Sequence, residues 1–117
     1  MSTMATVSNQ KYQLAVEFDG DGPQDEARII EAEELLREEL WTGIVSGHET
    51  GGGCARLLVI TAFPLACLAD ICRRLRWIQM HPVRATRQSI DEGRSGQILA
   101  TGVPEVIALD ESVHLCQ

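Results

Sequence analysis

The segment Thr42–Ala62 reads TGIVSGHETGGGCARLLVITA and predicts a strand, a glycine-rich turn and a second strand. Its three consecutive glycines can adopt the positive φ angles that a tight hairpin turn needs. The second strand, Arg56–Ala62, is almost continuously apolar, which is typical of a central strand. In the first strand, alternation predicts two faces. They are Ile44, Ser46 and His48 on one side, and Val45, Gly47 and Glu49 on the other.

The chain on either side of this hairpin predicts elements that pack on it. The first is an alternating strand and the second a helix with one apolar stripe. A second helix opens on a proline, which is tolerated in the first helical turn. A bent or edge strand containing Pro82 and two short extended pieces follow. In order, the expected elements are Tyr12–Phe18, Pro23–Leu40, Pro64–Leu75, Trp77–Ile90 with its regular part at Val83–Gln88, Gln97–Thr101 and Glu105–Leu109.

This order of elements predicts an α+β fold, a ferredoxin-like βαββαβ sandwich with an antiparallel sheet and two helices on one face. Residues 1–10 are expected to be a flexible N-terminal tail and residues 11–95 the ferredoxin-like domain. Residues 96–117 are expected to form a C-terminal extension that packs on the sheet or extends it. The face without helices is then wet, covered by the extension, or paired with another chain.

The charge of the chain is acidic and unevenly distributed. The net charge is −7, and residues 1–50 carry 11 acidic and 3 basic residues. Nucleic-acid binders need clustered Lys and Arg, so this balance argues against that class. It permits a basic protein partner, although an acidic charge that only keeps the domain soluble is the commoner case. No apolar run is long enough to span a membrane, and the first residues lack the pattern of a secretory signal. A cytoplasmic protein is expected.

The four cysteines, Cys54, Cys67, Cys72 and Cys116, lack the spacing of a zinc site or of a C-x-x-C pair. Free, mostly buried thiols in a reducing compartment are the simplest interpretation. We therefore expect no metal and no cofactor. Tyr12, Trp41 and Trp77 would either line a ligand cavity or, as is commoner for aromatic residues, belong to the core.

Gly47–Gly53, GHETGGG, is the strongest chemical signal. It lacks the second histidine of H-E-x-x-H and the Lys-Ser/Thr of a P-loop. What remains is His48, whose intrinsic pKa suits acid–base chemistry, with Glu33 on the preceding helix or Glu49 beside it to orient the ring. The alternative is a structural histidine, hydrogen-bonded to the helix, and a lone His–Glu pair favours that interpretation.

Several of these residues together resemble a family. Asp19, Glu33, the G-H-E-x-G-x-G segment, the strand ending at Thr61 and Pro64 are similar to small uncharacterised bacterial proteins with a ferredoxin-like α+β domain. The resemblance covers residues 12–76 and implies the fold but no catalytic residues. Some proteins of this size and acidity are immunity partners of toxins.

The resulting functional hypothesis is a domain that acts by protein–protein contact, immunity- or regulator-like, without catalysis. Glu31, Glu34 and Glu38 of the acidic helix are the candidate surface for a basic partner, and the sheet face or edge is a candidate homodimer surface. The alternative is a small ligand-binding domain or enzyme of the dimeric α+β barrel type that uses His48 with Glu33 or Glu49.

Overall fold

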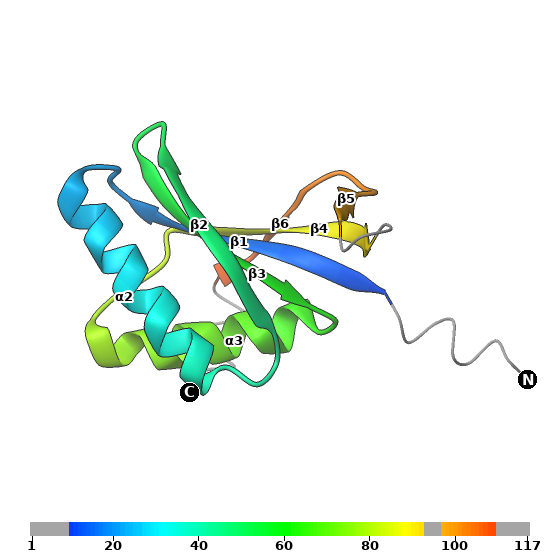
Figure 1. Ribbon diagram of the computed structural model, residues 1–117, viewed down its shortest axis with the longest axis horizontal. Helices are drawn as coiled ribbons and strands as arrows, with labels where there is room; N and C mark the ends of the chain where they lie inside the picture. The colour runs from blue at the N-terminus through cyan, green and yellow to red at the C-terminus, as the bar shows by residue number, and fades with distance from the viewer. Residues whose placement is uncertain (1–9, 93–96, 110–117) are drawn as a thin grey trace, which may run out of the picture.

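The computed structural model describes residues 10–92 and 97–109 of the chain. Most of the expected tail, the end of the loop before residue 97, His114 and Cys116 lie outside these residues. The helices and strands are shown in Figure 1. They are β1 (Lys11–Asp19), α2 (Pro23–Glu39), β2 (Ile44–Gly51), β3 (Cys54–Thr61), α3 (Pro64–Leu75), the short 3₁₀ helix η1 (Arg76–Ile78), β4 (Arg84–Glu92), β5 (Ile98–Ala100) and β6 (Glu105–Ile107).

The protein is an α+β fold with a six-stranded antiparallel sheet and two helices. The strand order is β2-β3-β1-β4-β5, and β6 also pairs with β4. The four strands expected for a ferredoxin-like domain are therefore part of a larger sheet, whose order differs from the four-strand pattern. The two added strands come from residues 98–107 and both pair with β4, which is long enough to hold them one after the other.

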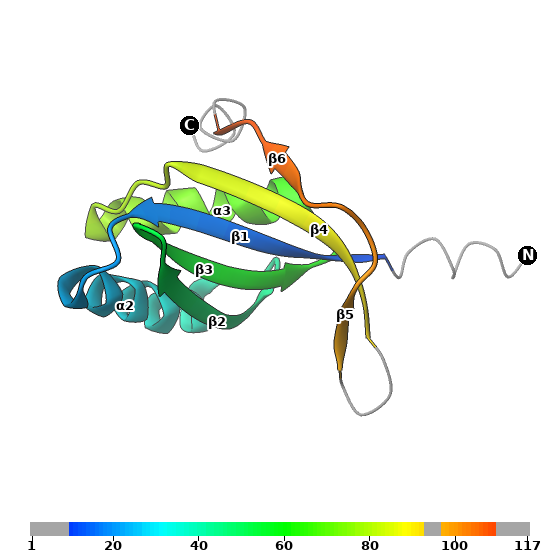
Figure 2. The same cartoon turned by 90° about the horizontal axis from the view of Figure 1, so that it is seen from above.

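Both helices cover the same face of the sheet. Seen from above, the strands lie in front of α2 and α3 (Figure 2). Leu14, Val16 and Phe18 of β1 point into this layer, which confirms the alternation expected for the first strand. In β3 every second residue is buried on the same side. The buried helix residues that meet these strands include Ile29, Ala32, Leu36, Leu68, Ile71 and Leu75.

The helices begin where the sequence predicts. Gly22 precedes α2 with an extended backbone, and its N–H donates to the Asp25 carboxylate at 3.1 Å. Pro23 occupies the first turn, where a missing N–H costs nothing. Pro64 does the same in α3. Within the part of the chain that the structure describes, neither helix is long and apolar enough to cross a membrane.

The prediction that a strand begins at Trp77 is wrong. Residues 76–78 form a 3₁₀ turn, which closes when the Gln79 N–H donates to the Arg76 carbonyl at 3.0 Å. Gln79 then takes a left-handed conformation, with φ of 57°, so an extended strand cannot pass through this position. The strand begins only at Arg84, after Pro82, and Trp77 is left 83% exposed.

Trp41 is also outside the core. Its side chain is 88% exposed in the connection between α2 and β2. The expectation that Trp41 and Trp77 fill the core or line a cavity inside the sheet–helix layer is therefore wrong. The layer is filled by aliphatic side chains, which the sequence supplies on every strand and helix that faces it.

Candidate functional site

A β-bulge decides where His48 lies. The pairing of β2 with β3 shifts between Val45 and Gly47, so Ser46 is the extra residue of β2. Before the bulge, Val45 faces the helices opposite Val59; after it, His48 does so opposite Leu57. The simple alternation, which placed His48 with Ile44, is thus wrong, because one extra residue reverses the two faces of a strand.

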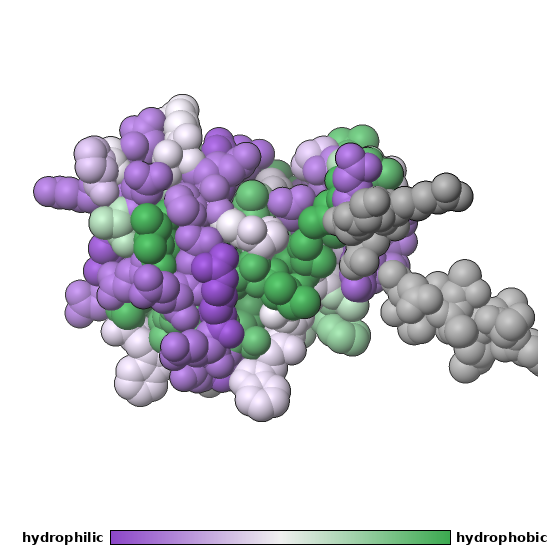
Figure 3. Space-filling model, in the orientation of Figure 1, coloured by the Kyte–Doolittle hydropathy of each residue, from purple (hydrophilic) through white to green (hydrophobic). Residues whose placement is uncertain are grey.

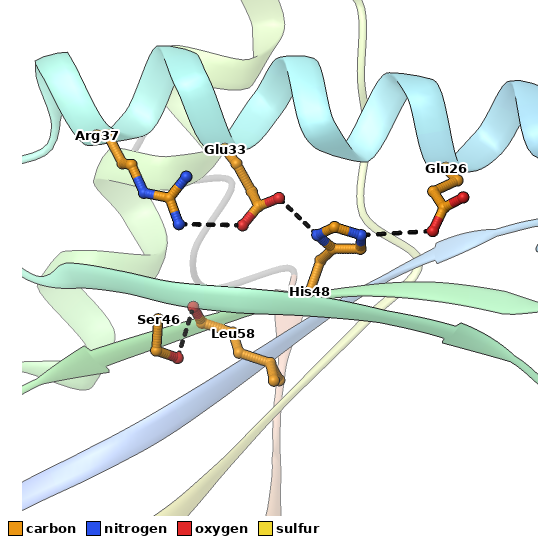
Figure 4. A network of polar contacts seen from close by, with 6 residues as sticks. All are labelled: Glu26, Glu33, Arg37, Ser46, His48 and Leu58. Carbon is orange, nitrogen blue, oxygen red and sulfur yellow. Dashed lines mark hydrogen bonds and ion pairs between the residues drawn. The ribbon is translucent and has the colours of Figure 1, made fainter.

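This reversal brings His48 against α2. Figure 4 shows a row of polar side chains between β2 and the helix. The His48 Nδ1 atom lies 2.5 Å from the Glu33 Oε1 atom, and the other Glu33 oxygen lies 3.4 Å from the Arg37 guanidinium. The His48 Nε2 atom lies 3.6 Å from the Glu26 Oε2 atom. An ionised Glu33 carboxylate only accepts hydrogen bonds, so with Glu33 in that form Nδ1 is the donor of this contact.

Burial makes Glu33 the centre of this row. Glu33 is only 5% exposed, although glutamate is rarely buried without partners. Its two oxygens are each matched, one by His48 and one by Arg37. The sequence left the position of Glu33 open because it lies beside apolar helix residues. The structure places it on the inner side of α2 and pairs it with His48, as one of the sequence hypotheses required.

The carboxylates beside His48 limit the chemistry that this row of side chains can perform. Both ring nitrogens of His48 have a carboxylate within 3.6 Å, so a substrate that reaches the ring must compete with Glu33 or Glu26. Three cavities formed by residues of the described part of the chain are lined by other residues. The geometry is that of a polar clamp, which ties the middle of α2 to β2 across the layer.

Glu49, the third catalytic candidate, lies apart from this row. It pairs in register with Arg56 and is exposed on the sheet face opposite the helices. Adjacent residues of a strand point to opposite faces, so Glu49 cannot orient the ring of His48. Of the three candidates, the structure therefore joins two and separates one.

The proposed partner-binding residues share one exposed side of α2. Glu31, Glu34 and Glu38 are all exposed, at a spacing that repeats along one helical face. Glu31 is 3.6 Å from Arg28, an exposed ion pair of the kind that contributes little to stability. The segment Pro23–Glu39 holds seven carboxylates and two arginines. The side of α2 that faces away from the sheet therefore presents concentrated negative charge.

An exposed apolar cluster follows directly after this helix. Trp41 is 88% exposed, Ile44 72% and Phe63 65%. Together with Lys11 and Ile60 they line a groove of about 290 Å³ at the end of the sheet. Figure 3 shows purple side chains over α2 and an apolar area beside them over β2 and β3. Single exposed apolar residues are ordinary, whereas a contiguous group indicates a contact surface.

Sequence reasoning missed this cluster because Trp41 was expected to line a ligand cavity or belong to the core, and Phe63 was not expected to be exposed beside it. A usable signal was present, since Trp41 and Phe63 each stand in a connection between elements and not inside one. Apolar residues of connections are not placed by the period of a helix or strand.

A second polar cluster was also missed. Asp70 of α3 is 7% exposed and accepts from Arg73 at 2.6 Å and from the Thr42 hydroxyl at 3.4 Å. Arg74 lies 3.3 Å from Glu39 of α2. Arg74 thus joins the two helices, and Asp70 joins α3 to the α2–β2 connection. The partners of Arg73 and Arg74 are carboxylates of the fold, which supports the structural interpretation of arginines at a helix end.

Metal coordination has no candidate among residues 10–92 and 97–109, where no three His, Cys, Asp or Glu side chains gather closely enough. Cys54, Cys67 and Cys72 are free thiols. Comparison of the chain with protein-family models, with curated proteins and with solved structures gives no match, so its function is inferred from the contacts described above.

Proposed function

We propose that this protein is a small cytoplasmic domain of the bacterial ferredoxin-like kind, without catalysis, which acts by binding a protein with a basic surface. The observation that carries the proposal is the placement of Glu31, Glu34 and Glu38 together on the exposed side of α2. Negative potential concentrated on one surface steers a positively charged partner into register and speeds its association.

The rigidity of α2 supports this role. The helix is held from below by apolar packing and by the contact between Glu33 and His48 at 2.5 Å. A helix that is already ordered loses less conformational entropy when a partner binds, so more of the interaction energy appears as affinity. The acidic surface is thus presented in one fixed arrangement.

This arrangement suits a protein that blocks or regulates its partner. A basic active site or nucleic-acid-binding surface on the partner would be covered by the acidic side of α2, whose glutamates imitate the negative charge of a phosphate backbone. Immunity proteins and regulators that work by covering a site on their partner need such a surface and no catalytic residues.

The test compares two triple variants that change the net charge equally. The first reverses Glu31, Glu34 and Glu38 to Lys, and the second reverses the carboxylates Asp19, Asp91 and Glu105, which lie outside α2. A partner captured with the wild-type protein is purified, and its dissociation constant for each variant is measured by calorimetry. We expect a loss of about tenfold or more for the α2 variant alone. Equal affinity of both variants for the partner would contradict the proposal.

A second candidate function rests on the His48–Glu33 contact. A carboxylate that orients a histidine through Nδ1 is the arrangement that a general base requires, and this is the ligand-binding or dimeric α+β barrel alternative. It requires that Glu26 move away from Nε2 when a ligand enters. A metabolite screen that follows the His48 ring signals by NMR tests it, with a His48→Gln variant as the control. Ring signals that stay unchanged throughout the screen would count against it.

A further inference from the structure

Among residues 10–92 and 97–109, both helices lie on one face of the sheet and no helix lies on the opposite face. We propose that this face binds a second copy of the chain and forms a two-fold symmetric dimer. The proposal is separate from binding through α2, because α2 lies on the other face of the sheet (Figure 2). The evidence is the register of the strands, the exposure of the side chains on this face and its charge.

Apolar side chains lie along two rows of this face. Across β2 and β3, Ile44 lies opposite Ile60, and this row continues to Gln13 and Gln88. In the next row Leu58 lies beside Ala15 of β1, and the row continues through Thr86 of β4 to Val106 of β6. Ile44 is 72% and Val106 65% exposed. Burying such side chains against a copy of themselves removes apolar surface from water, which is the main favourable term in association.

A row of charged side chains lies beside these two rows. Glu49 lies opposite Arg56, Arg56 opposite Glu17, and Glu17 opposite Arg84. The signs alternate along the row, and the Arg56 and Glu17 side chains lie 3.6 Å apart. The row has as many positive as negative groups, so two copies can place unlike charges against each other, as an interface of identical surfaces requires.

The charge of the whole chain favours this face over the acidic side of α2 for contact between two copies. Two chains of net charge −7 repel each other wherever their acidic surfaces meet. Contact through the charge-balanced face leaves α2, with its seven carboxylates, on the outer side of each copy. The two most acidic surfaces are then separated by both sheets. A second copy is therefore the occupant that suits this face, while a basic partner suits α2.

One end of this face has both a groove and exposed aromatic side chains that could fill the same groove of a second copy. Trp41 and Phe63 are exposed and line the groove of about 290 Å³ together with Ile44 and Ile60. In a two-fold dimer each copy offers the same groove and the same aromatic side chains. Large aromatic residues in pockets dominate the binding energy of most interfaces. Trp41 is therefore expected to lose contact with water when the dimer forms.

The experiment uses the full chain and its two tryptophans. The variant Trp77→Phe keeps Trp41 as the only tryptophan, and Trp41→Phe keeps Trp77, which lies on the helix side near Leu35 and Glu39. Sedimentation and tryptophan emission are followed over about 1 μM to 1 mM protein. We expect a dimer whose formation shifts the emission of Trp41 to shorter wavelength, with the emission of Trp77 unchanged.

A matched pair of substitutions locates the interface. Ile44→Glu and Ile30→Glu place the same charge at two exposed isoleucines, one on the open face and one on α2. We expect Ile44→Glu to raise the dimer dissociation constant by about tenfold or more and Ile30→Glu to leave it near the wild-type value. Circular dichroism verifies that both variants are folded, which their exposed positions favour.

Three results would overturn the proposal. They are a wild-type protein that stays monomeric over the whole concentration range, a dimer that Ile44→Glu and Ile30→Glu affect equally, and a dimer that forms with no change in Trp41 emission. The reversal of the α2 glutamates is expected to leave the dimer intact. Failure of partner binding and failure of dimer formation are therefore seen in different variants.

Discussion

Glu33 shows how much one buried carboxylate depends on its partners. It is 5% exposed and is bonded on one oxygen by His48 and on the other by Arg37. If one partner is removed, the carboxylate stays buried with an unmet hydrogen bond, which costs more than a hydrogen bond gains. The contribution of the Glu33–His48 contact to the free energy of unfolding is therefore a coupling energy between the two residues. It is best measured by substituting each residue alone and both together.

We expect Glu33→Ala and His48→Ala each to destabilise the protein, and the double variant to be less destabilised than the sum of the two. The coupling energy should be about 1 kcal/mol or more, as is usual for residues in direct polar contact. Denaturant unfolding of the four proteins measures it. Glu34→Ala is the control, since this neighbouring glutamate is exposed. Additive effects of the two substitutions would mean that the clamp contributes nothing beyond its separate residues.

Burial also determines how reactive the thiols of the chain are. Cys67 is fully buried, and this burial raises the pKa of its thiol above the ordinary value, with a smaller raising effect from Asp70 and lowering effects from the Thr42 and Thr61 hydroxyls. A raised pKa in the folded state keeps the thiol protonated at alkaline pH. The thiolate is the reactive form, so Cys67 should be the slow thiol of the chain.

In a Cys72→Ser, Cys116→Ser background we expect two phases when the folded protein meets Ellman's reagent at pH 8. The first is fast and belongs to Cys54, which is partly exposed at the start of β3. The second is slow and belongs to Cys67, and denaturant should abolish it. A Cys54→Ser variant serves as the control, since it should lose the fast phase only. Equal rates in the folded protein would contradict the assignment.

The connection between α2 and β2 requires a glycine at position 43. It passes so close to β3 and α3 that a Cβ atom at Gly43 would lie 2.9 Å from the Cys67 Sγ atom and 2.9 Å from the Ile60 carbonyl oxygen. The sequence suggests Gly43 only as a helix end. Its role is instead close approach of the backbone, which no local pattern reveals because the contacts are with residues far along the chain.

Gly43→Ala is therefore expected to destabilise the protein by about 1–3 kcal/mol, the usual cost of overpacking a site that cannot relax. The carbonyl of Ile60 belongs to a paired strand and cannot move away. Gly102→Ala is the control, since its Cβ atom would meet only ordinary contacts at 3.5 Å and beyond. Thermal unfolding of both variants measures the difference. A Gly43→Ala protein as stable as Gly102→Ala would show that the connection is looser than its geometry indicates.

At the scale of the whole molecule, charge is divided between two faces. The acidic side of α2 lies on one face of the sheet, and the open face carries charges of both signs in register. Salt screens attraction between exposed opposite charges and also screens repulsion between two acidic copies. The two proposed contacts should therefore respond to salt in opposite ways.

We expect the partner that binds α2 to lose affinity when ionic strength rises from about 0.05 to 0.5 M, while self-association stays constant or strengthens. Calorimetry measures the first and sedimentation the second, in the same buffers. The α2 charge-reversal variant is the control, since the partner binding that remains should lose its salt dependence. Self-association that weakens with salt as much as partner binding does would contradict the division of roles.

The sequence alone determined the elements and the class of fold. A period-two pattern in β1, a continuous apolar run in β3, a helical stripe in α2 and prolines at two helix starts are local features, and the structure confirms them within a residue or two at most ends. The exposure of Glu31, Glu34 and Glu38 could also be predicted, because these charged residues lie largely away from the apolar stripe of α2. These features depend on the chain itself and its contact with water.

Only the tertiary structure decided which side chains meet. The bulge at Ser46 turns His48 toward Glu33, and it exists only in the pairing of β2 with β3. The exposed position of Trp41 depends on aliphatic residues already filling the layer. The two strands added beside β4 depend on its free length. Each is a relation between distant segments, and its energy comes from contacts that a local sequence pattern cannot contain.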